Sequence, residues 1–149
     1  MALIDKDSGT RVIDASTAHR TAKGWIYGFP ELVGPNVVSG ADRVSNPGCY
    51  PTGFLALVAP LVRAKLLPND WPYSVNAVSG YSGGGKGLIQ RFEGEGSDIA
   101  FRAYGLGLDH KHLDEMKSKA GLKHAPVFAP SVIAGFRGMV VEVPLPIQA

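Results

Sequence analysis

"SNPGCYPTG", residues 45–53, holds the only cysteine of this 149-residue chain. The apolar residues after it are spaced as on one face of a buried helix, namely Phe54, Leu55, Leu57, Val58, Leu61 and Val62. We expect this helix to begin at Thr52, with a kink at Pro60 and a stop at Pro68. Cys49 then lies just before the helix N-terminus, where free N–H groups and the helix dipole favour a thiolate and stabilise an oxyanion. The spacing is equally compatible with a cysteine buried as a small apolar residue.

The composition excludes several classes of protein. A hydrophobic content of 45% excludes general disorder, and 149 residues are enough to bury a sizeable core. A net charge of +2 without a basic stripe argues against a nucleic-acid partner. The longest apolar stretch, residues 53–62, is too short to span a bilayer, and the polar, acidic N-terminus predicts no signal peptide. A lone cysteine fits a reducing cytosol, so we predict a cytoplasmic protein.

The patterning predicts an α/β chain with a mixed sheet and helices packed on it. Strands are expected at residues 10–16, 73–80, 99–106, 125–133 and 138–146. Helices are expected after Cys49, around residues 88–92, and from Asp109, a suitable N-cap. Residues 24–34 are predicted to be an irregular aromatic stretch. Because no linker or repeat interrupts the pattern, residues 1–149 are predicted to form a single domain.

The segment "DHKH", residues 109–112, brings two imidazoles together. A cysteine nucleophile needs an imidazole to accept and return a proton. On a helix, residues two apart point in different directions, so only one of His110 and His112 would face the sulfur. Two solvated histidines are the alternative. A zinc site made of these histidines and Cys49 is disfavoured, because H-x-H spacing suits strands and no second cysteine exists, and no metal is predicted.

Two further segments have features of anion-binding or nucleotide-binding sites. "SGYSGGGKG", residues 79–87, is expected to be a glycine-rich loop that lets the backbone approach a phosphate, with Ser82 and Lys86 as further donors. It matches neither the Walker nor the G-x-G-x-x-G pattern, and a flexible connection is the alternative. In "VIDAST", residues 12–17, Asp-x-Ser after a strand is typical of the edge of a nucleotide-binding sheet. The same side chains, those of Asp14, Ser16 and Thr17, could instead cap the next turn.

Among the 15 Lys and Arg residues of the sequence, five scattered cations are considered as candidate anion-binding residues: Lys6, Arg20, Arg91, Arg102 and Lys111. Most of them are expected to be solvated surface residues. One of them could clamp an anionic substrate, because Lys and Arg side chains form charge-assisted hydrogen bonds with carboxylates and phosphates.

Four segments in this order resemble N-acetyl-gamma-glutamyl-phosphate reductase, a family of arginine biosynthesis, in its shorter bacterial form. They are "VIDASTAHRT", "VSNPGCYPTG", "NAVSGYSGGGKG" and "YGLGLDHKHLDEM". The resemblance runs from Arg11 to Leu145, and the cysteine motif is its most specific part. It implies the fold of the catalytic domain of glyceraldehyde-3-phosphate-dehydrogenase-like reductases, with residues 1–20 resembling the end of a Rossmann half.

The resemblance implies a role for each motif residue. Cys49 corresponds to the nucleophile and His110 to the acid/base histidine. The residues implied to orient that histidine or to meet substrate are Tyr104, His112 and Glu115. The residues implied to approach the cofactor, NADP, are Ser16, Ser82, Gly83 and Gly84. The implied reaction begins when the Cys49 thiolate attacks an acyl phosphate and forms a thioester. NADPH then reduces the thioester to the semialdehyde.

The chain departs from the family pattern in two places. No G-x-x-G-x-x-G turn precedes "VIDAS", and Asp114 stands where the family usually has proline. We therefore expect the catalytic middle of the enzyme, with most of the NADP site missing, little activity alone, and self-association through unpaired edge strands. Two alternatives remain open: a cofactor-independent cysteine acyl transferase or hydrolase, and a non-catalytic module for oligomerisation or substrate binding.

Overall fold

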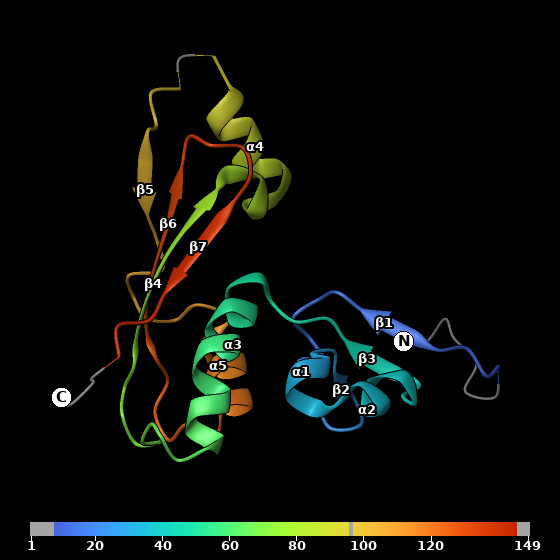
Figure 1. Cartoon of the computed structure of the whole chain (residues 1–149). Coiled ribbons are helices and arrows are strands. Elements are labelled where there is room, and N and C mark those ends of the chain that lie inside the picture. Colours follow the sequence, from blue (N-terminus) through green and yellow to red (C-terminus); the bar gives the residue numbers. More distant parts are fainter. Residues whose placement is uncertain (1–7, 96, 146–149) are drawn as a thin grey trace.

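A computed structural model describes residues 8–95 and 97–145, and these residues form two sheets joined by a central helix (Figure 1). The first sheet is parallel, with strand order β1-β3-β2. Its strands are β1 (Val12–Asp14), β2 (Ile26–Tyr27) and β3 (Arg43–Ser45). Two short helices, α1 (Pro30–Val33) and α2 (Pro35–Ser39), connect β2 to β3. The stretch predicted to be irregular therefore contains β2 and α1, and β3 was not predicted.

The second sheet is mixed, with strand order β5-β6-β4-β7. Its strands are β4 (Ser74–Gly80), β5 (Phe101–Ala103), β6 (Val127–Ile133) and β7 (Met139–Glu142). β4 and β6 are parallel, whereas β7 is antiparallel to β4 and β5 is antiparallel to β6. The predicted α/β class with a mixed sheet is confirmed.

The central helix, α3 (Cys49–Arg63), follows β3 and begins three residues earlier than predicted. Pro51 does not prevent this, because a proline in the first helical turn removes no intrahelical hydrogen bond. The helix continues through Pro60 and ends well before Pro68. Its first residue is Cys49, which therefore lies within the N-terminal turn rather than ahead of it.

The core forms where α3 packs against the second sheet and against α5 (Leu113–Ala120). Phe54, Leu55 and Val58 of α3 are fully buried, as predicted, but Leu57 is 46% exposed because it lies on the solvent side of the helix. Leu61 and Val62 are half-buried. Other large buried members of the core are Tyr73, Val75, Met116 and Phe128.

The starts of two further helices also differ from the prediction. The helix expected around residues 88–92 is present, but it begins earlier: the segment expected to be a loop contains a 3-10 turn, η1 (Tyr81–Gly84), and the first residues of α4 (Gly85–Glu93). Tyr81 stacks on Phe92 at 5.0 Å between ring centroids, and this packing outweighs the low helix propensity of glycine. α5 begins at Leu113 instead of Asp109, because residues 110–113 form a turn in which the Leu113 N–H donates to the His110 carbonyl and the His112 N–H donates to His110 Nδ1.

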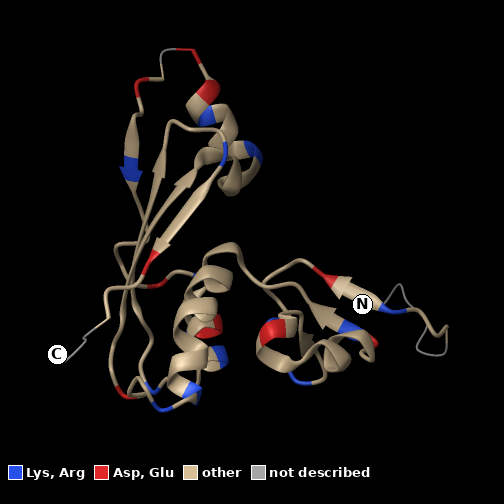
Figure 2. Cartoon of the chain, viewed as in Figure 1, with Lys and Arg blue, Asp and Glu red and all other residues tan. Residues whose placement is uncertain are grey.

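Figure 2 shows charged residues of both signs in every part of the described chain, on helices, strands and loops, with Lys and Arg gathered in no single segment. In the part of the chain that the structure describes, no helix is both long and apolar enough to cross a membrane.

Candidate active site

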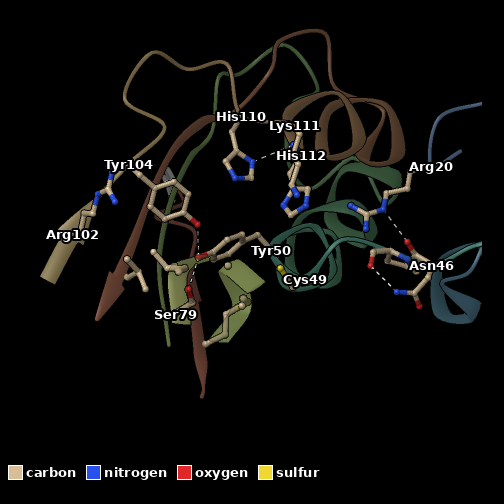
Figure 3. Close-up of a pocket in the computed structure, with 16 residues that line it drawn as sticks. Arg20, Asn46, Cys49, Tyr50, Ser79, Arg102, Tyr104, His110, Lys111 and His112 are labelled. Carbon is tan, nitrogen blue, oxygen red and sulfur yellow. Dashed lines mark hydrogen bonds between the residues drawn. The ribbon is translucent and has the colours of Figure 1, made fainter. Parts of the chain in front are cut away.

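A cavity of about 680 Å³ brings together residues from the segments that flank the first sheet, from the start of α3 and from the second sheet with its loops (Figure 3). Arg20 and Asn46 of the N-terminal part lie on one side of it, and Tyr104 and Arg102 lie on the other. Cys49 lies between them, exposed at the start of α3. The predicted residues that line this cavity are Cys49, Gly83, Gly84, Tyr104, His110 and His112. Three predicted residues do not line it, namely Ser16, Ser82 and Glu115.

Few backbone donors remain free at the start of α3. The Gly48 N–H donates to the Glu115 carboxylate at 2.7 Å, and Pro51 has no N–H. The Thr52 N–H donates to the Gly48 carbonyl, as in a regular helix. The helix start therefore presents the N–H groups of Cys49 and Tyr50 to an oxyanion, fewer than a free helix N-terminus offers.

His110 lies in the turn before α5, and a backbone hydrogen bond sets its tautomer. The backbone N–H of His112 donates to His110 Nδ1 at 3.2 Å, so in the neutral ring the proton resides on Nε2. Burial, followed by the nearby Lys111 charge, lowers the pKa of His110, against an opposing effect of Asp109. At neutral pH, His110 is thus an N–H donor at Nε2.

His112 is only 4% exposed and lies against the Gly48–Cys49 turn. A Cβ placed on Gly48 would approach His112 Nε2 to 2.9 Å, whereas His112 Nδ1 is buried without a hydrogen-bond partner among the described residues. Burial, with smaller effects of His110 and Arg20, lowers the pKa of His112 to about 3. Its ring centroid is 4.7 Å from that of His110. Both rings line the cavity, because neither residue lies on the helix where only one was expected to face the sulfur.

The lowered pKa of His112 predicts a pH-dependent stability. The folded value near 3 lies below the unfolded value of about 6.5, so the unfolded chain binds more protons and stability falls as the pH drops below 6.5. At pH 5 the loss attributable to His112 is about 2 kcal/mol. Urea unfolding at pH 7 and pH 5 measures it, with His112→Gln as the control. An equal loss in that variant would contradict the assignment.

Tyr104 ends a chain of hydroxyl groups along the cavity wall. Tyr50 OH donates to Ser79 Oγ at 2.8 Å, so Tyr104 OH, at 2.9 Å, is the donor to Tyr50. Burial raises the pKa of Tyr104, and the hydrogen bond to Tyr50 reinforces this, so the phenol stays protonated. Sequence analysis missed Tyr50 and Ser79, because nothing in the local pattern shows that their hydroxyl groups meet.

Arg20 is a buried structural cation rather than a surface one. It is 8% exposed and donates to the carbonyls of Asn46 and Ala15 and to the Glu115 carboxylate, at 3.0, 3.2 and 3.2 Å. Glu115, 2% exposed, forms hydrogen bonds with neither histidine.

Two other cations face the cavity. Arg102 and Lys111 line it as exposed residues, and neither has an ion-pair partner in residues 8–95 and 97–145. Arg91 is exposed and does not line the cavity, and Lys6 lies outside the described residues. Within residues 8–95 and 97–145, no carboxylate side chain lines the cavity.

The predicted cofactor residues divide into two groups. Gly83 and Gly84 line the cavity beside Leu88, whereas the Ser82 backbone N–H donates to the Phe136 carbonyl. Ser16 lies outside the cavity and caps its own turn: its N–H and Oγ donate to Asp14 at 2.9 and 2.8 Å, and its Oγ accepts the Ala18 N–H. The turn-capping alternative is thus what the structure contains at this segment.

Asp14 also pairs with His19, which stacks on Trp25. The hydrogen bond with His19 is the main cause that lowers the pKa of Asp14 to about 2.

Among the residues that the structure describes, no group of three His, Cys, Asp or Glu side chains is arranged to hold a metal ion.

Comparison with known proteins identifies the family. Residues 49–149 match the family described as "Semialdehyde dehydrogenase, dimerisation domain". The chain is 51% identical to the N-acetyl-gamma-glutamyl-phosphate reductase of Trichormus variabilis, over 94% of this chain and 46% of that protein. It is 47% identical to the same enzyme of Burkholderia orbicola, over 96% of this chain and 47% of that protein. It is 49% identical to the same enzyme of Sinorhizobium medicae, over 97% of this chain and 49% of that protein.

The chain thus spans about half the length of the curated relatives it matches. Across that half, the cysteine motif, the histidine turn and the glycine-rich segment that form the cavity are the motifs on which the resemblance was based. The chain belongs to the semialdehyde dehydrogenase family and is a homologue of the N-acetyl-gamma-glutamyl-phosphate reductases, as its motifs predicted.

Proposed function

We propose that this chain carries the acyl-transfer site of an N-acetyl-gamma-glutamyl-phosphate reductase. The observation that carries the proposal is the cavity itself: an exposed cysteine at a helix start shares it with two imidazoles, two unpaired cations and no carboxylate. Such a lining favours an anionic acyl compound next to a thiol nucleophile. The names of the relatives make an N-acetyl-glutamyl phosphate the substrate of choice.

In the proposed acylation, the Cys49 sulfur forms a bond to the acyl carbon, and the bond from that carbon to the phosphate oxygen breaks. The N–H groups of Cys49 and Tyr50 hold the carbonyl oxygen while it carries negative charge. The proton released by the thiol equals the one that the departing phosphate requires, so a single imidazole can transfer it.

The two histidines are proposed to have different roles: His112 accepts the thiol proton and returns it to the departing phosphate, whereas His110 donates a hydrogen bond without transferring its proton. Because Nδ1 of His110 accepts a backbone hydrogen bond, its Nε2–H supports a donor role toward substrate oxygen. His112, against the Gly48–Cys49 turn, is then the acceptor of the thiol proton. The pKa of His112 in the empty cavity is low, and a bound dianion beside it raises that pKa by favouring the charged ring.

Alanine variants separate these two roles. His112→Ala is expected to slow both iodoacetamide alkylation of Cys49 and its acylation. His110→Ala is expected to slow acylation alone by about 100-fold, because alkylation by a neutral haloacetamide develops no oxyanion. Equal effects of the two variants on both reactions would contradict the division.

The residues of the cavity also fit the nicotinamide end of NADP. Gly83 faces open space, with no heavy atom within 4 Å of where a Cβ would stand, and Gly84 lies next to it on the cavity wall. These two glycines would hold a flat ring close to the Cys49 thioester. NADPH, when bound, supplies the hydride that reduces the thioester to the semialdehyde. Ser16 gives weaker support, because its hydrogen-bonding groups are already engaged within its own turn.

We further propose that residues 1–149 act as one catalytic unit in a cytoplasmic homo-oligomer. The cavity between the two sheets supports a single unit, and the description of the family as a dimerisation domain supports self-association. Residues 1–20 are proposed to continue a nucleotide-binding half, as the parallel pairing of β1 with β3 allows.

Phosphate release in a single turnover tests the proposal. Mixing the chain with N-acetyl-glutamyl phosphate, without NADPH, is expected to release one phosphate per chain in a rapid phase, and Cys49→Ser is expected to remove that phase. A burst that persists in Cys49→Ser would exclude the thiol as nucleophile. Repeated turnover without NADPH would instead support the cofactor-independent hydrolase.

The cation-lined cavity predicts a preference for anionic reagents. The ratio of alkylation rates for iodoacetate and iodoacetamide is expected to be about 3- to 10-fold higher at Cys49 than for free cysteine at low salt. Arg102→Gln is expected to lower this ratio. Arg137→Gln is the matched control and should leave the ratio unchanged, because Arg137 lies over Phe136 and outside the cavity. An unchanged ratio in Arg102→Gln would contradict the role of Arg102.

A further inference from the structure

Glu115 collects hydrogen bonds from three distant parts of the chain. Its carboxylate accepts from Tyr27 OH at 2.6 Å, from the Gly48 N–H at 2.7 Å and from Arg20 at 3.2 Å. The three donors lie 88, 67 and 95 residues away in the sequence, all in the N-terminal part. A carboxylate that is 2% exposed is tolerable only with such partners, one of them a cation.

The hydrogen bond to Gly48 reaches the peptide immediately before the nucleophile. Gly48 is the N-cap of α3 and Cys49 is its first residue. In a capping box, a Glu within the same helix reaches back to the N-cap N–H. Here a Glu from a different helix, α5, accepts that N–H. The orientation of the Gly48–Cys49 peptide is therefore set from outside its own helix.

The Glu115 side chain also lies close to the place where the Gly48–Cys49 turn meets His112. Glu115 stands in the first turn of α5, three residues after His112, which occupies the N-cap position of that helix. A Cβ on Gly48 would approach Glu115 Oε2 and His112 Nε2 to 2.9 Å each, and Arg20 Nη1 to 2.7 Å. The turn thus has no room to move toward His112, and the hydrogen bond to Glu115 opposes movement away from it.

We propose that Glu115 is a positioning residue, whose Oε1 holds the Gly48–Cys49 turn at a fixed place beside His112. It meets no substrate, since it does not line the cavity. It also pairs with Arg20, so that Arg102 and Lys111 are left as the cations for a substrate anion. The inference rests on the proposed role of Cys49 as nucleophile.

The test separates the reach of the side chain from its charge. Glu115→Gln keeps the oxygen that accepts from Gly48 and Tyr27, but it removes the negative charge facing Arg20. Glu115→Asp keeps the charge but is shorter by one methylene, so its carboxylate falls short of the Gly48 N–H. Iodoacetamide alkylation of Cys49 is measured in both full-length variants, together with their urea midpoints.

We expect the alkylation rate of Cys49 to depend on whether the side chain at position 115 is long enough to accept the Gly48 N–H, and not on its charge. Alkylation in Glu115→Gln should stay within about 3-fold of wild type despite lower stability, and in Glu115→Asp it should fall about 10-fold. Met116→Ala controls for destabilisation, because Met116 is a fully buried neighbour of Glu115 on α5 and forms no hydrogen bond with Gly48. Cys49 in this variant should be alkylated at the wild-type rate. A slow Glu115→Gln with a normal Glu115→Asp would overturn the proposal, and so would wild-type rates in both.

A second measurement needs no variant. In wild type, the Gly48 amide is expected to resist hydrogen exchange although it stands at a helix N-cap; rapid exchange would overturn the proposal. Cysteine alkylation and hydrogen exchange require no acyl phosphate. The proposal about Glu115 can therefore fail while the phosphate burst is observed, and it can hold while the burst is absent.

Discussion

Replacing Gly48 by alanine is expected to slow alkylation and acylation of Cys49 by about 100-fold although the thiol itself is retained. The new Cβ would stand 2.7 Å from Arg20 Nη1 and 2.9 Å from both Glu115 Oε2 and His112 Nε2. All three groups are buried, and Arg20 and Glu115 are paired with each other, so relief requires breaking this ion pair, displacing the His112 ring or moving the nucleophile turn. Overpacking of this kind also lowers the free energy of unfolding by about 1–3 kcal/mol.

Gly87→Ala is the matched control for this prediction. Gly87 lies on α4, has open space around its Cβ position and does not line the cavity. Alanine there is expected to leave Cys49 reactivity unchanged and to stabilise α4 by about 0.5–1 kcal/mol, because glycine is the poorer helix former. A Gly48→Ala variant that reacts at the wild-type rate would mean that the turn is not held as tightly as its contacts require.

Phe54→Ala is expected to lower the free energy of unfolding by about 3–5 kcal/mol. Phe54 is fully buried on α3, the helix that packs against both α5 and β7. Truncating a large buried side chain removes its transfer free energy and leaves a cavity that the surrounding core fills only in part. Urea unfolding with linear extrapolation measures the change, which should appear in the midpoint rather than in the slope.

Leu57→Ala provides the comparison on the same helix. Leu57 is 46% exposed, so its truncation is expected to change stability by about 0.5 kcal/mol or less. Equal losses in the two variants would contradict the orientation of α3. The pair also tests a point on which sequence spacing was wrong, because the apolar pattern placed Leu57 on the buried face.

Six of the residues that line the cavity could be predicted from local motifs, because the cysteine turn, the H-x-H segment and the glycine-rich segment are short and specific. The way in which these residues come together in the cavity could not be predicted. His110 Nδ1 accepts the His112 N–H in a turn ahead of α5, so both histidines precede that helix instead of lying on it, and the residue pattern does not reveal a hydrogen bond from the backbone to a ring nitrogen. Glycines in residues 83–87 predicted a loop, but aromatic stacking of Tyr81 on Phe92 holds that segment helical.

The positioning network was beyond sequence analysis for a different reason. Its donors are separated from Glu115 by 67 to 95 residues, and one of them is a backbone N–H that no side-chain pattern records. Arg20 likewise looks like any exposed cation in the sequence until the fold buries it beside Glu115. Long-range hydrogen bonds of this type depend on how the two sheets are placed around α3.

The most direct measurement is to locate the acyl group on the chain. Wild-type protein mixed with N-acetyl-glutamyl phosphate is quenched in acid within seconds, digested and mapped by mass spectrometry. We expect one hydroxylamine-sensitive acyl group on the peptide that contains Cys49, absent from the Cys49→Ser variant. A folded chain that carries no acyl group, or carries it on another residue, would contradict the assignment of this cavity as an acyl-transfer site.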